Sequence, residues 1–313
     1  MNRREWIQSG VAAAAAGWVS KLCSAEGSES RVIDTHTHFY DPTRPEGVPW
    51  PAKDTALYRT VLPKDWLAVA APHGVRETVV VEASDRVEDN QWILDLAERE
   101  PSIVGFVGNL DPADAAFARH VKRFAAHPLF VGVRWRSGLV DLEDDFPTKL
   151  AGARTLAAHD LELDLNGRNG HSAEGVRLAR GVPELRIVIN HLGGPANSTQ
   201  PSEEWKESMK ALADCPNVNM KVSALVEQAR TRDNEAPRDL EPYLEVLDFL
   251  WDAFGEDRLV YGSNWPVSDR GAPYEVVIDL VRRYFKTKGP VAEEKYFSGN
   301  AKRIYRWVER QKV

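Results

Sequence analysis

Residues 32–40 read VIDTHTHFY, an apolar start followed by polar side chains. Seven further runs of comparable length and of largely apolar, β-branched character follow along the chain: ETVVVEA (77–83), IVGFVGNL (103–110), FVGVRWR (130–136), LELDLNG (161–167), RIVINHLGG (186–194), VNMKVSA (218–224) and RLVYGSNWP (258–266). Continuous runs of Val, Ile and Leu are typical of parallel strands that are buried on both faces. The sequence therefore predicts eight parallel strands.

Amphipathic stretches separate these runs. Residues 88–99, 113–126, 172–180 and 241–254 carry apolar side chains three and four positions apart, which is the spacing of one helix face. Strands that alternate with helices form a parallel sheet, and eight such units favour a closed (β/α)₈ TIM barrel over an open doubly wound sheet. No glycine-rich phosphate-binding turn follows the first run, which weakens a nucleotide-binding alternative. We expect an α/β protein with a single barrel domain over residues 26–313.

Residues 1–25 differ in composition from the rest of the chain. Arg3 and Arg4 are followed by an alanine-rich apolar stretch over residues 11–19 and then by small residues. This order is typical of a twin-arginine export signal and predicts a periplasmic protein; without such a signal the protein would be cytoplasmic. The alternatives are an N-terminal helix packed on the domain and a lipid anchor at Cys23. The apolar stretch is too short for a membrane span, which needs about 20 apolar residues.

The charge and cysteine content argue against a nucleic-acid-binding protein and against a protein stabilised by intrachain disulfides. The 313 residues include 40 Lys and Arg against 47 Asp and Glu, a formal net charge of −7. No basic block lies beside aromatic side chains, so the charge pattern of a nucleic-acid-binding protein is missing. Cys23 would be removed with an export signal, and Cys215 alone cannot form an intrachain disulfide. We expect a small-molecule substrate as the partner, with no nucleic acid and no integral membrane span.

The first run carries the strongest local signal for function. Side chains two apart on a strand share a face, so we expect Asp34, His36 and His38 to point together into the barrel. Two imidazoles at the end of a buried strand are costly unless something binds them, and a divalent cation is a natural partner. Core histidines satisfied by hydrogen bonds are the alternative. His191, near the end of the sixth run, is a third histidine in a comparable position.

Polar side chains stand near the C-terminal end of every predicted strand, which is the end where barrel enzymes carry their catalytic groups. Besides the histidines they are Glu82, Asn109, Arg134, Arg136, Asn166, Lys221, Ser223 and Asn264. The fixed charge and fork geometry of arginine suit a carboxylate or a developing oxyanion. Residues 41–60 leave the first strand at the same end and are interpreted as a lid or as a surface excursion. Trp50 within them could stack on a substrate ring.

Four segments resemble one known family. The runs VIDTHTHFYDP, INHLGGP, GSNWPV and GNAKRIYR, spread over residues 31–306, are similar to the amidohydrolase-related (amidohydrolase 2) metal-dependent hydrolases. Their order resembles the branch of L-fuconolactonase-like and pyrone-dicarboxylate lactonase-like enzymes. The resemblance implies a (β/α)₈ hydrolase of cyclic esters. It also implies that His36, His38 and His191 bind a metal or polarise a carbonyl, and that Arg134 binds substrate.

The chain departs from that family pattern at two places. Asn264 stands where relatives commonly have an Asp that binds metal or acts as the general base, and an amide cannot take a proton from water. The fourth run, residues 130–136, offers no lysine that could be carbamylated to bridge two metals. The resemblance therefore implies one divalent metal, with Zn²⁺ the first expectation, or no metal at all.

These observations define a functional hypothesis: hydrolysis of a sugar or aromatic-acid lactone by attack of water on a polarised carbonyl. The predicted catalytic set is His36, His38, His191 and Asn264, and the predicted substrate-binding set is Arg134, Glu82, Asn166 and Trp50. The general base is left open between His191, Glu82, Asp269 and a metal-bound hydroxide. The alternatives are a nonoxidative decarboxylase on the same fold and, because of Asn264, a non-catalytic periplasmic binding protein.

Overall fold

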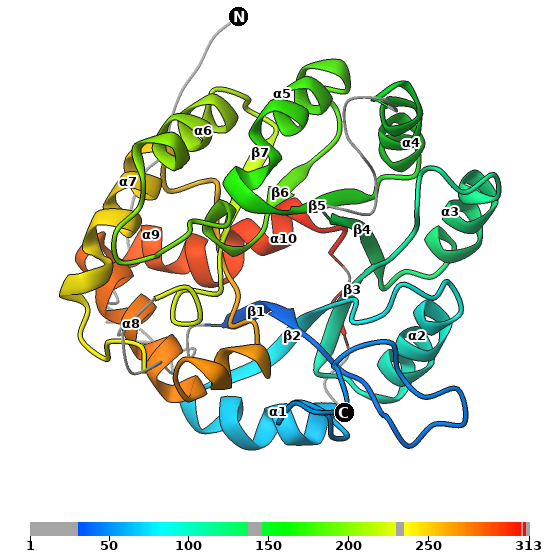
Figure 1. The fold of residues 1–313 in the computed structure, drawn as a ribbon, viewed down its shortest axis with the longest axis horizontal. Helices are drawn as coiled ribbons and strands as arrows, with labels where there is room; N and C mark the ends of the chain where they lie inside the picture. The colour runs from blue at the N-terminus through cyan, green and yellow to red at the C-terminus, as the bar shows by residue number, and fades with distance from the viewer. Residues whose placement is uncertain (1–30, 137–145, 230–234, 308, 311–313) are drawn as a thin grey trace, which may run out of the picture.

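Eight parallel strands form the centre of the molecule in the computed structural model (Figure 1). The structure describes residues 31–136, 146–229, 235–307 and 309–310. The strands are β1 (Val32–Thr37), β2 (Val75–Val81), β3 (Ile103–Gly108), β4 (Phe130–Arg136), β5 (Glu162–Asn166), β6 (Ile187–Ile189), β7 (Val218–Val222) and β8 (Leu259–Tyr261). Each pairs in parallel with the next. Thr37 bridges Trp265 beyond β8, which closes the sheet and confirms the predicted (β/α)₈ barrel.

Helices surround the barrel on its outer side (Figure 1). They are α1 (Pro63–Ala70), α2 (Asp89–Arg99), α3 (Phe117–Ala125), α4 (Phe146–Ala158), α5 (Ser172–Gly181), α6 (Glu203–Ala213), α7 (Leu244–Phe254), α8 (Tyr274–Thr287), α9 (Pro290–Glu294) and α10 (Asn300–Ile304). The helix predicted over 113–126 begins only at Phe117. The carboxylate of Asp111 accepts the Ala113 N–H at 2.8 Å and so holds the preceding residues in a turn instead.

Two apolar layers hold this architecture together. Inside the barrel, buried side chains from strands on all its sides contact one another: Ile33, Val79, Val81, Val104, Val107, Val131, Val188 and Val260. Ile304 and Tyr305 at the end of α10 pack against the same cluster. A larger cluster fills the space between the strands and the helices. Each fully buried Val or Leu contributes roughly 1.5–3 kcal/mol, so these layers are the main stabilising element of the fold.

The C-terminal segment is fastened to the end of the barrel where the strands begin. One guanidinium nitrogen of Arg306 donates to the carbonyl oxygen of His127 at 3.1 Å, just before β4. Arg310 donates to the carbonyl oxygens of Ala97 and Ile103 at 2.9 and 3.1 Å. Arg306 and Arg310 therefore lie on the face opposite the C-terminal ends of the strands.

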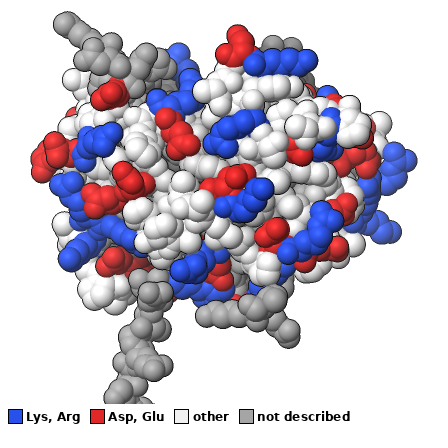
Figure 2. Space-filling view, turned by 90° about the horizontal axis from the view of Figure 1, so that it is seen from below, with Lys and Arg blue, Asp and Glu red and all other residues white. Residues whose placement is uncertain are grey.

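The surface charge and the length of the helices bear on two predicted absences, that of a nucleic-acid partner and that of a membrane span. On the face shown in Figure 2, Lys and Arg are interspersed with Asp and Glu, without a continuous basic area. The exclusion of nucleic acid stays a prediction. No helix within the described ranges is long and apolar enough to cross a membrane. Residues 1–25, with the predicted export signal and Cys23, lie outside the described residues.

Candidate active site

Three histidine side chains meet at the C-terminal end of the barrel. His36 lies in β1, His38 directly follows that strand, and His191 follows β6. The ring centroids of His36 and His38 are 5.0 Å apart, and those of His36 and His191 are 4.4 Å apart. Because β1 and β6 are not neighbours in the sheet, the closure of the barrel brings these imidazoles together.

The position of His36 depends on a close approach between β1 and the chain after β8. A Cβ atom at Gly262 would lie 2.8 Å from Cβ of His36 and 3.2 Å from Cβ of Ser223. Ordinary contacts begin at 3.4 Å, so any residue other than glycine at position 262 would collide with the side chain of His36.

The prediction that Asp34 points with the two histidines of β1 is wrong. Its carboxylate accepts the Ser263 N–H at 2.8 Å and the hydroxyl of Tyr274, in the outer helix α8, at 3.2 Å. Burial raises the pKa of Asp34 to about 6. The pairing of β1 with β2 is irregular between Asp34 and Thr37, and this irregularity breaks the strict alternation of side chains along the strand.

Hydrogen bonds orient two of the three imidazoles. Nδ1 of His38 lies 2.9 Å from the carbonyl oxygen of Val81, and Nδ1 of His191 lies 2.9 Å from Oγ of Ser223. Both ring nitrogens of His36 are buried and have no hydrogen-bond partner in the described part of the chain. Burial first, and neighbouring charged groups second, lower the pKa of His36 and of His191 well below the usual range. Both rings are therefore neutral at neutral pH and keep a lone pair.

The histidines adjoin a cavity of about 240 Å³. Seven of the residues singled out in the sequence line it: His38, His191, Asn264, Arg134, Glu82, Asn166 and Trp50. The eighth, His36, is fully buried and contacts the rings of His38 and His191. The structure thus brings the predicted catalytic and substrate-binding residues together, whereas their chemical roles stay predictions.

A buried arginine and a buried glutamate face each other in this cavity. Nη1 of Arg134 at the end of β4 lies 3.7 Å from Oε1 of Glu82, which follows β2. The two residues are only 6% and 3% exposed, so solvent screens their charges weakly. The guanidinium offers a fixed positive charge to a substrate oxygen, and the carboxylate offers an acceptor for a substrate hydroxyl.

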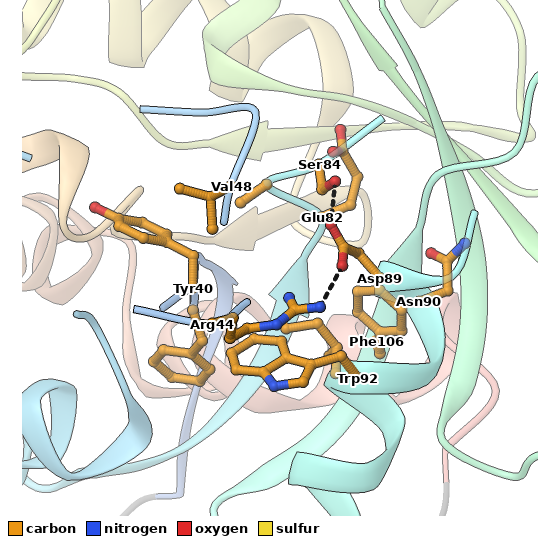
Figure 3. A pocket seen from close by; sticks show the side chains of 12 residues that line it. Tyr40, Arg44, Val48, Glu82, Ser84, Asp89, Asn90, Trp92 and Phe106 are labelled. Atoms are coloured by element: carbon orange, nitrogen blue, oxygen red, sulfur yellow. Dashed lines mark hydrogen bonds and ion pairs between the residues drawn. The ribbon is translucent and has the colours of Figure 1, made fainter. Parts of the chain in front are cut away.

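Part of residues 41–60 lies against the site, and the interpretation of this segment as a lid or as a surface excursion stays a prediction. The ring centroid of Trp50 is 5.7 Å from that of His38. Figure 3 shows Arg44 reaching from this segment to Asp89 at the start of α2, where the ion pair measures 2.7 Å. The guanidinium also lies 4.7 Å from the ring centroid of Trp92. These contacts fasten the segment beside the cavity.

Other polar residues named from the sequence lie elsewhere. The backbone N–H of Asn109 donates a hydrogen bond to Oδ1 of Asn90 at 2.9 Å, and Asn109 is part of the barrel rim. Lys221 is fully buried in an ion pair of 2.8 Å with Asp164. Asp269 lines a neighbouring cavity together with Arg59 and Arg270, not the cavity of the histidines. The side chain of residue 136 lies outside the described side chains.

Sequence reasoning missed two residues of this region. Arg270 lines the catalytic cavity from the loop after β8. Its place at the catalytic end of a strand could have identified it. Glu227 lies in the irregular chain after β7, and its Oε1 accepts a hydrogen bond from Nδ2 of Asn264 at 2.7 Å. No periodicity or motif marks this glutamate.

The arrangement of His, Cys, Asp and Glu side chains bears on whether the site can bind a metal ion. Within residues 31–136, 146–229 and 235–310, apart from residue 308, no group of three or more His, Cys, Asp or Glu side chains is arranged to hold a metal. The buried, unpartnered nitrogens of His36 nevertheless have the chemistry that a divalent cation would satisfy. Metal binding by His36, His38 and His191 stays a prediction.

The family model described as "Amidohydrolase" matches residues 33–307. The chain belongs to the amidohydrolase family. An L-fucono-1,5-lactonase of Burkholderia ambifaria is 34% identical over 286 residues, which cover 88% of this chain and 95% of that protein. This relative confirms the resemblance to the lactonase branch.

Solved structures of other proteins have the same architecture as this amidohydrolase. The crystal structure of an amidohydrolase from Burkholderia multivorans with bound Zn has a TM-score of 0.78 and 26% identity, over 89% of this chain and 100% of that one. A probable 2-pyrone-4,6-dicarboxylic acid hydrolase from Acinetobacter baumannii has a TM-score of 0.68 and 16% identity, over 88% of this chain and 98% of that one. The second likeness shows the fold alone.

Proposed function

We propose that this amidohydrolase hydrolyses the lactone of a sugar acid by attack of water on the ring carbonyl. The observation that carries the proposal is the convergence of the neutral imidazoles of His36 and His191 with the buried Arg134 at one cavity. The similarity to an L-fucono-1,5-lactonase over 95% of its length supports a cyclic ester as the substrate class.

His191 is the general base in this proposal. Oγ of Ser223 accepts the backbone N–H of His191 at 3.1 Å and, in the tautomer that we assign, also the Nδ1–H at 2.9 Å. Nε2 then carries the lone pair and takes a proton from water as the new C–O bond forms. When the ring C–O bond breaks, the imidazolium returns this proton to the leaving oxygen, so that lactone and water give one hydroxy acid.

Arg134 stabilises the negative charge that develops on the carbonyl oxygen. Its charge is fixed, and its burial in the cavity makes the interaction stronger than it would be in water. Glu82 beside it accepts a hydroxyl of the sugar acid, and Trp50 packs on the ring.

The proposal includes one divalent metal, expected to be Zn²⁺, or none. His36, His38 and His191 would hold it, and when bound it would supply polarisation of the carbonyl. Because the neutral imidazole of His191 has one ring lone pair, His191 acts as the general base only in the form without metal. The chemistry assigned to His191 and Arg134 rests on the residues themselves.

A panel of sugar-acid and aromatic-acid lactones, assayed with and without chelator, tests the proposal. We expect turnover of a sugar-acid lactone and a fall on the order of 100-fold or more in His36→Ala and in His191→Ala. Unchanged rates in both variants would refute it. Release of CO₂ without consumption of water would instead identify a decarboxylase. Tight binding without turnover, with a large gain of rate in Asn264→Asp, would identify a binding protein.

We also propose that residues 1–25 form a twin-arginine export signal and direct the protein to the periplasm. The paired Arg3 and Arg4 before a weakly apolar stretch support this. N-terminal sequencing of the protein from a periplasmic fraction should give a chain that begins near residue 26. An intact Met1 in that fraction contradicts the proposal.

A further inference from the structure

Glu227 lies behind Asn264 as seen from the catalytic cavity. Asn264 belongs to the cavity lining, whereas Glu227 does not. Oε1 of Glu227 accepts the hydrogen bond from Nδ2 of Asn264 at 2.7 Å. Its other oxygen, Oε2, is buried without a hydrogen-bond partner among the described residues. A carboxylate in such surroundings is costly, and besides a bond from its own backbone N–H it accepts the one from the side chain of Asn264.

The backbone of Asn264 is already fixed. Its φ of 62° lies in the left-handed region, its N–H donates to the carbonyl oxygen of His36 at 2.8 Å, and its own carbonyl accepts the Ser268 N–H at 3.1 Å. These backbone bonds do not determine whether the oxygen or the nitrogen of the planar carboxamide faces the cavity. An ionised carboxylate only accepts hydrogen bonds, so Glu227 selects the nitrogen and leaves the oxygen on the opposite side.

We propose that Glu227 is a positioning residue that holds the carboxamide of Asn264 with its oxygen toward the cavity, where this oxygen accepts a hydrogen bond from the attacking water. One O–H of the water then points to Asn264 and the other to His191, and an oxygen lone pair faces the carbonyl. The kinetic part of this inference rests on the proposed lactone hydrolysis, whereas the pairing of the two side chains does not.

The hydrogen bond between Glu227 and Asn264 depends on pH. Burial raises the pKa of Glu227 to about 7. The other titratable or charged groups that face it are Asp269, Arg270 and Tyr243. A protonated Glu227 can donate to the oxygen of Asn264 as well as accept from the nitrogen, so it no longer selects one orientation of the carboxamide. The productive orientation is therefore present above pH 7 and is lost as the pH falls through this value.

Three substitutions separate positioning from structure in the hydrolysis of L-fucono-1,5-lactone, corrected for spontaneous hydrolysis. Glu227→Ala should lower kcat on the order of 10- to 100-fold with KM nearly unchanged, because the carboxamide is no longer oriented. Glu227→Gln offers both a donor and an acceptor, as the protonated carboxyl does, so it should leave kcat between those of the wild type and Glu227→Ala and remove the fall of activity below pH 7. Glu204→Gln is the matched control, because the exposed Glu204 accepts from the Asn169 side chain at 2.8 Å and its substitution should change neither quantity.

A spectroscopic measurement tests whether Glu227 and Asn264 pair, and it does not require the enzyme to be active. In ¹⁵N-labelled protein, the side-chain amide signal of Asn264, identified by its absence in Asn264→Asp, should shift with a midpoint near pH 7. The transition should persist in Asp269→Asn and disappear in Glu227→Gln. A signal without this transition, or one that keeps it in Glu227→Gln, would overturn the inference, as would a Glu227→Ala enzyme with the wild-type kcat. A wild-type protein inactive on every lactone would refute the proposed function, and the amide titration would still decide the pairing.

Discussion

Replacing Gly262 with alanine tests whether backbone packing holds His36 in place. The added Cβ would lie 2.8 Å from Cβ of His36 and 3.3 Å from Cδ of Lys221. Because ordinary contacts begin at 3.4 Å, the first pair of atoms must separate by about 0.6 Å. Overpacking of this kind typically costs about 1–3 kcal/mol. A catalytic group displaced by about 1 Å loses on the order of 100-fold in rate, so a shift of about 0.6 Å is expected to cost on the order of 10-fold or more.

We therefore expect Gly262→Ala to lower kcat on the order of 10- to 100-fold and the free energy of unfolding by about 1–3 kcal/mol. Steady-state lactone hydrolysis and urea unfolding measure the two effects. Gly299→Ala is the control, because this glycine has a helical φ of −58° and its added Cβ would meet only the end of the Glu294 side chain, at 3.0 Å. If Gly262→Ala keeps the wild-type kcat and stability, the packing argument for His36 is refuted.

Three further substitutions probe the charged groups. Arg134→Lys should lower kcat roughly 10- to 100-fold in steady-state kinetics, because the guanidinium that stabilises the developing charge is lost; an unchanged kcat would argue against this role. Lys221→Met leaves the buried carboxylate of Asp164 without its partner at 2.8 Å and should lower the free energy of unfolding by about 3–5 kcal/mol in urea titrations; a neutral effect would contradict the buried ion pair. The folded-state pKa of Glu227, about 7, lies above its ordinary value of 4.5, so its stabilising contribution is complete below pH 4.5 and is lost as the pH rises through 7. Glu227→Gln should therefore raise Tm, relative to wild type, more at pH 8 than at pH 5, and an equal difference at both pH values would count against the raised pKa.

The barrel and most of its site could be predicted because their signals are local. Each strand is one short apolar run, and parallel strands present their last residues at one face of a closed barrel. Once the runs were placed, the polar residues that end them had to gather there. His36 and His38 therefore followed from the first run and His191 from the sixth, and Arg134 and Asn264 from two more.

The other features of the site depend on the folded geometry of the chain, which no local sequence pattern indicates. The direction of Asp34 was predicted wrongly because an irregular register in β1 breaks the alternation. Glu227 lies in irregular chain, 37 positions before its partner Asn264, and only the folded arrangement brings the two side chains within 2.7 Å. The delayed start of the helix at Phe117 reflects a competing side-chain hydrogen bond to the backbone.

The fastening of Arg306 and Arg310 to the carbonyl groups where the strands begin has a practical consequence. A tag added at the C-terminus emerges on the side away from the cavity. Molecules immobilised on beads through that tag would all be oriented with their openings toward the bulk liquid, and dissolved compounds would reach them without passing the support.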